Sequence, residues 1–240
     1  MRYCLRNGII QMALYTIGDL HLSLTANKPM DVFGPRWTNY VERLQQGFSE
    51  LTADDVTVLA GDLSWGMGLE EAGADFDFIH ALPGKKIIVK GNHDYWWTTA
   101  NKAKRFFAAR GIDSIEILHN NCFFYGDTAI CGTRGWFYEE ERGGEHDKKI
   151  MLREIGRLET SLKAAGEREK IVFLHYPPVY QNYRCAEILA LFRAYGVRRC
   201  YYGHLHGKSI AWAFNGELEG TAYRLISADA VAFKPQLVLN

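Results

Sequence analysis

The chain has 240 residues, of which 48% are apolar and 23% are charged, a composition that excludes a disordered or a fibrous protein. Basic and acidic residues number 28 each, so no net positive field favours nucleic acid or an anionic membrane as a partner. No apolar run approaches the roughly 20 residues of a membrane span, and the first residues lack the long apolar stretch of a secretory signal.

The cysteines predict a reducing compartment. They are five in number, widely spaced and without a CxxC pair: Cys4, Cys122, Cys131, Cys185 and Cys200. An odd number of such cysteines is typical of buried thiols in a cytoplasmic protein. We expect one domain over residues 1–240, with residues 1–11 as a non-essential extension, because the patterned sequence starts at Ala13 and translation could begin at Met12.

The first half of the chain alternates short apolar runs with amphipathic segments. The runs Ala13 to Ile17, Val56 to Ala60 and Lys86 to Val89 predict strands. Apolar residues recur at helical spacing over residues 36–51, and further helices are predicted over 69–82 and 98–109. Alternation of strand and helix predicts an α/β layered fold, in which ligands gather at the carboxyl ends of the strands.

The middle of the chain has a different pattern. Short runs at 115–118, 121–125 and 128–131 are separated by Asn120-Asn121 and by Gly126-Asp127, which predicts antiparallel hairpins. The charged segment Trp136 to Lys149 then predicts an exposed loop before a helix over 150–165. This loop is either a lid or an ordinary surface connection.

Strand patterns return in the last third. They occur in IVFLH at Ile171 to His175 and in CYYGHLH at Cys200 to His206, with a helix predicted over 186–195 between them. Short strands are expected over 209–214, 222–227 and 236–239, with a hairpin turn at Asn215-Gly216. We find no repeat or linker, which agrees with one domain.

Asp, Asn or His side chains follow five strand-like runs, usually after a glycine. The candidate site residues are Asp19, His21, Asp62, Asn92, His93, Asp94, His175, His204 and His206. A single histidine at a strand end is usually a satisfied polar residue, but five segments of the same plan indicate a shared metal site. Imidazole, carboxylate and amide ligands together suit manganese, iron or zinc.

These blocks resemble a known family. DLH at Asp19 to His21, GD at Gly61-Asp62, GNHD at Gly91 to Asp94, the lone His175 and GHLH at Gly203 to His206 resemble, in order and spacing, the signature blocks of the calcineurin-like metallophosphoesterases. The resemblance extends from Ala13 to about Lys208. It implies a four-layer α-β-β-α sandwich, in which two mixed sheets flanked by helices carry a binuclear metal site at the strand ends.

The resemblance also implies roles for individual residues. One divalent ion would be held by Asp19, His21 and His206, and the other by Asn92, His175 and His204, with Asp62 bridging both. A hydroxide shared by the two ions would attack a small phosphomonoester or phosphodiester. His93 would stabilise the transition state or protonate the leaving group, with Asp94 orienting its ring.

Two alternatives stay open. Pyrophosphohydrolases that act on a nucleotide-diphosphate lipid are similar in their opening block and length, but they carry Arg where this chain has His93. A scaffold protein of the same fold would lose ligands or this histidine, and the chain retains them all. Nucleases of the superfamily need a basic track, and none is visible.

Substrate selection is predicted only in outline. Aromatic residues follow the ligand turns at Trp65, Tyr95, Trp96, Trp97, Trp136, Tyr176 and Tyr180. They either form an apolar rim for a leaving group or belong to the core. Arg134, in GTRGW, is either a phosphate clamp or a partner in an ordinary ion pair.

Overall fold

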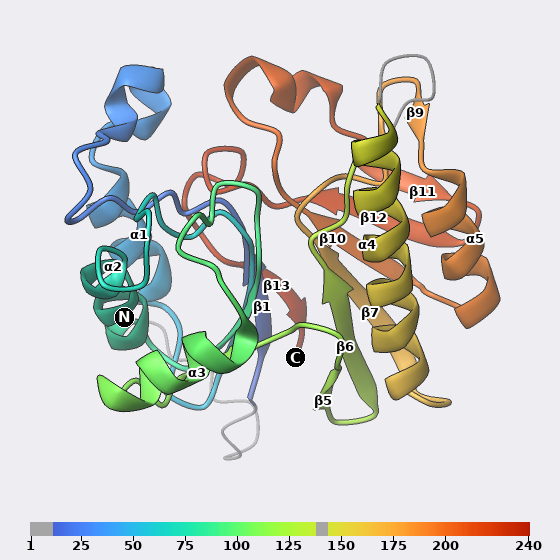
Figure 1. Ribbon diagram of the computed structural model, residues 1–240, viewed down its shortest axis with the longest axis horizontal. Coiled ribbons are helices and arrows are strands. Elements are labelled where there is room, and N and C mark those ends of the chain that lie inside the picture. Colours follow the sequence, from blue (N-terminus) through green and yellow to red (C-terminus); the bar gives the residue numbers. More distant parts are fainter. Residues whose placement is uncertain (1–11, 138–143) are drawn as a thin grey trace.

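Two large β-sheets lie face to face, and helices cover the outer face of each (Figure 1). The computed structural model describes residues 12–137 and 144–240. The first sheet contains, in spatial order, β13 (Gln236–Leu239), β1 (Leu14–Ile17), β2 (Val56–Ala60), β3 (Lys85–Val89) and β4 (Ile115–Ile117). The second contains β11 (Gly216–Leu218), β12 (Thr221–Leu225), β10 (Arg199–Tyr202), β7 (Glu169–Leu174), β6 (Thr128–Thr133) and β5 (Phe123–Tyr125). A small separate pair is formed by β8 (Val179–Tyr180) and β9 (Tyr183–Arg184).

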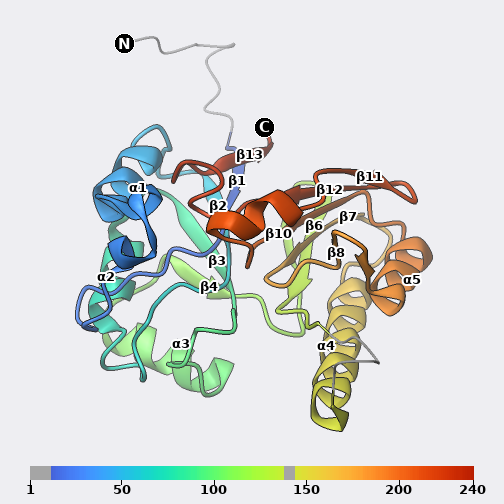
Figure 2. The ribbon, with the colours of Figure 1, turned by 90° about the horizontal axis from the view of Figure 1, so that it is seen from above.

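Helices on the two sides complete a four-layer sandwich (Figure 2). The first sheet is covered by α1 (Tyr40–Phe48), α2 (Gly73–Ala81) and α3 (Ala100–Ala109), and the second by α4 (Glu145–Ala164) and α5 (Ala186–Tyr195). Short 3₁₀ turns are η1 (Met30–Phe33), η2 (Pro35–Trp37) and η3 (Gly207–Trp212). The predicted fold class, mixed α/β with two sheets flanked by helices, is confirmed.

Three apolar layers hold the sandwich together. The middle layer lies between the sheets and includes Val58, Ile87, Ile130 and Phe173. The two outer layers lie between each sheet and its helices. β2 and β7 are buried along nearly their whole length, so their sequences are mainly apolar. The polar residues are Thr57 inside β2 and Glu169-Lys170 at the start of β7.

The inner strands of both sheets are parallel, and this brings the site residues together. β1, β2, β3 and β4 run parallel in the first sheet, and β12, β10, β7 and β6 in the second. The ends of β1 and β12 are joined across the sheets, where Gly18 N donates to Ile226 O at 2.8 Å. The carboxyl ends of five strands therefore meet at one edge of the sandwich.

The structure corrects several local predictions. β4 and β5 do not form a hairpin, because β4 extends the first sheet beside β3 and β5 pairs with β6 in the second. Asn120, at φ 62°, therefore lies in a crossover between the sheets. Residues 145–149 of the predicted loop 136–149 are the start of α4. Residues 138–143 of that loop, where a lid was predicted, fall outside the described residues.

The C-terminal region also differs from its prediction. The segment expected as a strand over 209–214 forms η3, whose first turn is fixed when His206 N donates to Ser209 Oγ at 2.9 Å. The hairpin between β11 and β12 turns at Glu219 and Gly220, with φ 52° and 79°, and not at Asn215-Gly216. Two consecutive residues with positive φ match the tight turn that the right-handed twist of strands prefers.

Candidate metal centre

The candidate ligands lie in tight turns directly after β1, β2, β3, β7 and β10. Four of them have a left-handed backbone: Asp19 (φ 58°), His21 (46°), Asp62 (51°) and His204 (73°). Non-glycine residues adopt this conformation only at a cost of about 1 to 3 kcal/mol each. Its recurrence in three separate turns, after β1, β2 and β10, indicates that these turns are shaped to direct the side chains toward one place.

One group of ligand atoms surrounds a point near the end of β1. Asp19, His21 and His206 each offer an atom, and these atoms lie within 4.8 Å of one another. His206 Nε2 is 3.1 Å from Asp19 Oδ1 and 3.2 Å from His21 Nε2. The three residues that the family resemblance assigned to one ion thus lie close together.

A second group lies beside the first. Asn92 Oδ1 is 2.7 Å from His175 Nε2 and 2.9 Å from His204 Nδ1. The Nδ1 atom of His175 is 3.1 Å from Ala60 O, and donation to this carbonyl leaves the Nε2 lone pair directed at Asn92. Two acceptors then face each other at hydrogen-bond distance, an arrangement that a cation between them would stabilise.

Asp62 lies between the two groups. Its Oδ1 accepts a hydrogen bond from His93 N at 2.7 Å. Its Oδ2 is 3.6 Å from His21 Nε2 and 3.5 Å from His175 Nε2, and it is buried without a hydrogen-bond partner among the described residues. An ionised oxygen is costly to bury without a counter-charge. The donor set therefore fits a pair of divalent cations sharing Asp62.

Glycines next to the ligands are required by close packing. A Cβ on Gly91 would lie 2.1 Å from Asp62 Oδ1, and a Cβ on Gly203 would lie 2.2 Å from Asp19 Oδ2. Both distances are far below van der Waals contact. Any larger residue at these positions would displace a candidate ligand.

The charges of the centre are strongly coupled. Burial alone would lower the pKa of His206, but the charges and hydrogen bonds of Asp19 and Asp229 raise it to about 10. Burial raises the pKa of Asp62 to about 7, with a smaller contribution from the charge of Asp94. For His204, burial and then the charge of His175 lower the pKa to about 3.

The environment of Asp94 differs from its prediction. It does not contact the ring of His93, because its oxygens accept from the backbone N–H groups of Asp62 (2.9 Å), Leu63 (2.8 Å) and Gly91 (2.6 Å) and from Trp96 Nε1 (2.9 Å). The side chain is buried. Asp94 therefore fastens the turn after β2 to the turn after β3, and the partner predicted for His93 is wrong.

His93 lines an open pocket next to the ligands. Its Nδ1 is 3.0 Å from the hydroxyl of Tyr95, and its ring centroid is 4.6 Å from that of Trp65. Burial, followed by the charge of His175, lowers the pKa of His93 to about 4. The pocket, of about 450 Å³, is also lined by His21, His206 and Lys28, so His93 borders space beside the centre that is large enough for a small ligand.

Asp229 is a site residue that the sequence reasoning missed. Its Oδ1 is 3.1 Å from His206 Nδ1, and its Oδ2 accepts from Gly207 N at 2.9 Å. Donation from Nδ1 leaves Nε2 of His206 free to bind a cation. The sequence pattern that could have identified it is present, because Asp229 follows β12 after small residues, as the candidate ligands follow the other strands.

The predicted aromatic rim divides between site and core. Trp65 stacks on His21 with centroids 5.0 Å apart, and Tyr95 is 47% exposed with its hydroxyl beside His93 Nδ1. Trp96 is fully buried in the outer apolar layer of the first sheet. Tyr176 packs against the ring of His204, with centroids 4.3 Å apart. Trp37, not singled out in the sequence, also lines the pocket.

The family follows from comparison with known sequences. The profile of the calcineurin-like phosphoesterases matches residues 12–208, a span that includes every candidate ligand. The chain belongs to this family, and membership implies metal-dependent hydrolysis of phosphoesters. A search among curated proteins found no match.

Solved structures show the same fold. A protein of unknown function from Aquifex aeolicus, AQ665, is 16% identical with a TM-score of 0.51, and the alignment covers 95% of this chain and 96% of that one. The protein TT1561 of Thermus thermophilus is 12% identical with a TM-score of 0.51, covering 95% and 98%. Across the described ranges, no helix has the length and apolar character to cross a membrane.

Proposed function

We propose that the chain is a binuclear metallophosphoesterase that hydrolyses a small phosphomonoester or phosphodiester. One ion would be held by Asp19, His21 and His206, and the other by Asn92, His175 and His204, with Asp62 shared. The observation that carries this proposal is the buried Oδ2 of Asp62, unpartnered among the described residues and 3.5 to 3.6 Å from a histidine of each group. Manganese, iron and zinc suit these ligands.

When bound, such an ion pair would activate a water and neutralise the phosphate oxygens. The protein positions this chemistry through the turns that carry the ligands. Asp94 fixes two of these turns to each other through Asp62 N and Gly91 N. Asp229 holds His206 by its Nδ1. Both are positioning residues, since neither faces the pocket.

We assign His93 the catalytic role. Its backbone N–H donates to Asp62 Oδ1 at 2.7 Å, which fixes the position of His93 beside the shared carboxylate. If Nδ1 accepts from the Tyr95 hydroxyl, the ring proton is on Nε2. The ring would then donate to a phosphoryl or leaving-group oxygen bound in the pocket, stabilising charge as it develops.

The pocket favours a substrate with an aromatic or apolar leaving group. Trp65 and Trp37 form its buried walls, Phe33 is 58% exposed at its edge, and the ammonium of Lys28 lies 3.2 Å from the ring centroid of Trp65. A leaving group could stack there while its phosphate faces the histidines. The lipid pyrophosphohydrolase and the inactive scaffold remain the alternatives to test.

A single assay separates these possibilities. The protein is loaded with Mn²⁺, Fe²⁺ or Zn²⁺ and given p-nitrophenyl phosphate, its diester bis(p-nitrophenyl) phosphate and UDP-glucose. Hydrolysis of the monoester or diester, absent in Asp62→Ala, supports the proposal. Hydrolysis of the pyrophosphate bond alone favours the pyrophosphohydrolase, and no hydrolysis with any metal favours the scaffold.

We also propose that the chain forms one cytoplasmic domain. Strands from both sheets share the middle apolar layer, and the two ligand groups come from both sheets. Cys122, Cys131, Cys185 and Cys200 are free thiols, as expected in a reducing compartment.

A further inference from the structure

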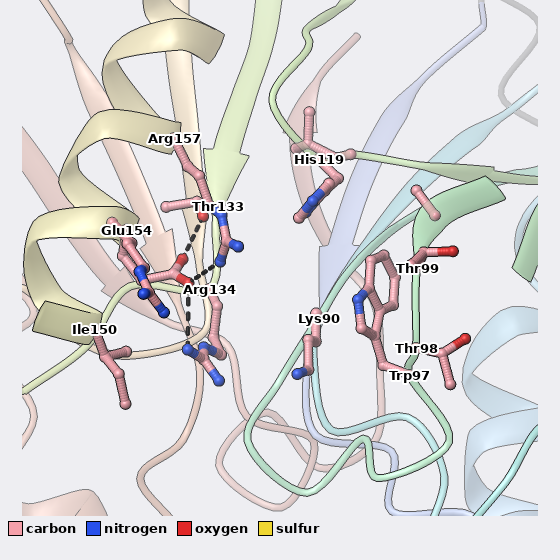
Figure 3. A pocket seen from close by; sticks show the side chains of 13 residues that line it. Lys90, Trp97, Thr98, Thr99, His119, Thr133, Arg134, Ile150, Glu154 and Arg157 are labelled. Carbon is pink, nitrogen blue, oxygen red and sulfur yellow. Dashed lines mark hydrogen bonds and ion pairs between the residues drawn. The ribbon is translucent and has the colours of Figure 1, made fainter. Parts of the chain in front are cut away.

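A second cavity, of about 430 Å³, lies between α3 and α4 on the flank of the sandwich (Figure 3). One wall comes from the end of β3 and the start of α3, and includes Lys90 and Trp97. The opposite wall comes from the end of β6 and from α4, and includes Arg134, Glu154 and Arg157. None of the candidate metal ligands lines it. Its volume is that of a small-molecule site.

The cavity carries a large excess of positive charge. Lys90, Arg134, Arg153 and Arg157 line it, and Glu154 is the only carboxylate among its described lining residues. His119 adds no charge near neutral pH, because burial and then the charge of Arg157 lower its pKa. Cations held this close repel one another, so a bound anion would stabilise the arrangement.

Glu154 neutralises only part of the positive charge that lines the cavity. It is buried and forms ion pairs with Arg134 (3.2 Å) and Arg157, while it also accepts from Thr133 Oγ1 at 2.6 Å. No carboxylate in the described part of the chain forms an ion pair with Lys90 or Arg153. The buried Nε of Arg134 has no acceptor among the described residues either. Two cations and one guanidinium N–H thus remain available to a ligand.

The other wall suits the organic part of such a ligand. Trp97 is half-buried, and its ring centroid lies 5.3 Å from that of His119. The start of α3 faces the same space with Thr98 and Thr99, and no acidic residue in its first turn offsets the partial positive charge of the helix end. Figure 3 shows the indole across the cavity from the guanidinium groups.

We propose that this cavity binds a small organic phosphate by its phosphate group, at a site separate from the metal centre. Arginine side chains pair with phosphate through two parallel hydrogen bonds. Four cations against one carboxylate in the lining favour a doubly charged phosphate over a singly charged carboxylate. Lys90 directly precedes Gly91-Asn92, and the carbonyl of Arg134 accepts from His175 N (3.1 Å) and Tyr176 N (2.8 Å). A ligand here would therefore contact residues that adjoin Asn92 and His175, two members of the second ligand group.

The test is calorimetric titration of the full-length, metal-loaded protein with inorganic phosphate and with phenylphosphonate, which carries an aromatic ring and cannot be hydrolysed. The wild type should show two binding events. In Arg153→Gln/Arg157→Gln one event should weaken at least about tenfold. Arg198→Gln, an exposed arginine on another surface, is the charge-matched control and should retain both. Tighter binding of phenylphosphonate than of phosphate would identify an organic ligand, and equal binding would identify the free anion.

A further variant separates this inference from the proposed function. Asp62→Ala should lose the event at the metal centre and retain the event in the cavity, whether or not the chain hydrolyses any ester. If the double variant does not fold, Arg153→Gln alone should weaken binding about threefold, because its side chain is exposed and has no ion pair in the described part of the chain. Wild-type binding that is lost entirely in Asp62→Ala, or a binding event that persists in Asp62→Ala and is unaffected by both arginine variants, would overturn the proposal.

Discussion

Replacement of Asp229 tests whether His206 is a metal ligand. Asp229 Oδ1 is 3.1 Å from His206 Nδ1, and Asp229 is 5% exposed. In Asp229→Ala the ring loses the acceptor that fixes its orientation and directs the Nε2 lone pair to the centre. The N–H of Gly207, now bonded to Oδ2 at 2.9 Å, loses its acceptor as well.

The expected magnitude follows from the kind of contact. Removing the carboxylate that orients a metal-bound histidine lowers metal affinity about 10- to 100-fold, which corresponds to roughly 1.4 to 2.7 kcal/mol. Asp229→Asn keeps an oxygen that can accept from Nδ1 but loses the charge. We therefore expect it to lie near the lower end of this range.

Competition with a fluorescent chelator measures the affinity of each variant for Mn²⁺ and Zn²⁺ without reference to activity. Asp113→Asn is the control, because its side chain is 92% exposed and distant in sequence from every candidate ligand. It should bind metal like the wild type. Wild-type metal affinity in a folded Asp229→Ala protein would refute the assignment of His206.

Three other predictions follow from single positions. Gly203→Ala places a Cβ 2.2 Å from Asp19 Oδ2 and should reduce the metal content measured by elemental analysis. The control Gly156→Ala has open space around it in α4 and should raise the free energy of unfolding by about 0.5 to 1 kcal/mol. Equal metal content in the two variants would contradict the packing argument. His93→Ala should lower turnover about 10²- to 10⁴-fold with metal content retained. The control His146→Ala, at an exposed position, should keep wild-type turnover. Joint loss of metal and activity in His93→Ala would make His93 a ligand. Burial lowers the pKa of Lys86 to about 8, so between about pH 8 and 10 the unfolded chain binds more protons than the folded chain. In urea unfolding, the stability of the wild type should therefore rise with pH relative to Lys86→Met, by at most about 1.4 kcal/mol per pH unit. Parallel pH profiles of the two proteins would show that Lys86 has an ordinary pKa.

The sequence predicted those features that depend on a few adjacent residues. The bounds of β2, α5 and β13 match their predicted ranges, because each is a run of one periodicity between clear breaks. The turns with the candidate ligands were recognised for the same reason. The structure brings these ligands together, while their roles in metal binding and catalysis remain predictions.

Features that depend on the packing of distant segments were not predicted. Asn120-Asn121 has the composition of a hairpin turn, yet the choice between hairpin and crossover is decided by which sheet has a free edge for β4 and β5. Adjacency in sequence likewise placed Asp94 beside the ring of His93, whereas three backbone N–H groups from two turns compete successfully for its oxygens. The cavity between α3 and α4 is lined by both Lys90 and Arg157, and no local sequence pattern links these two residues.

The number of metal ions that one chain binds tests the central claim most directly. Full-length protein is stripped of metal and titrated with Mn²⁺ by calorimetry, and its metal content is confirmed by elemental analysis. Sharing of Asp62 between the two ligand groups predicts two ions per wild-type chain and loss of tight binding at both positions in Asp62→Ala. Binding of fewer than two ions by the folded wild type, or of two by Asp62→Ala with wild-type affinity, would contradict a binuclear centre bridged by Asp62.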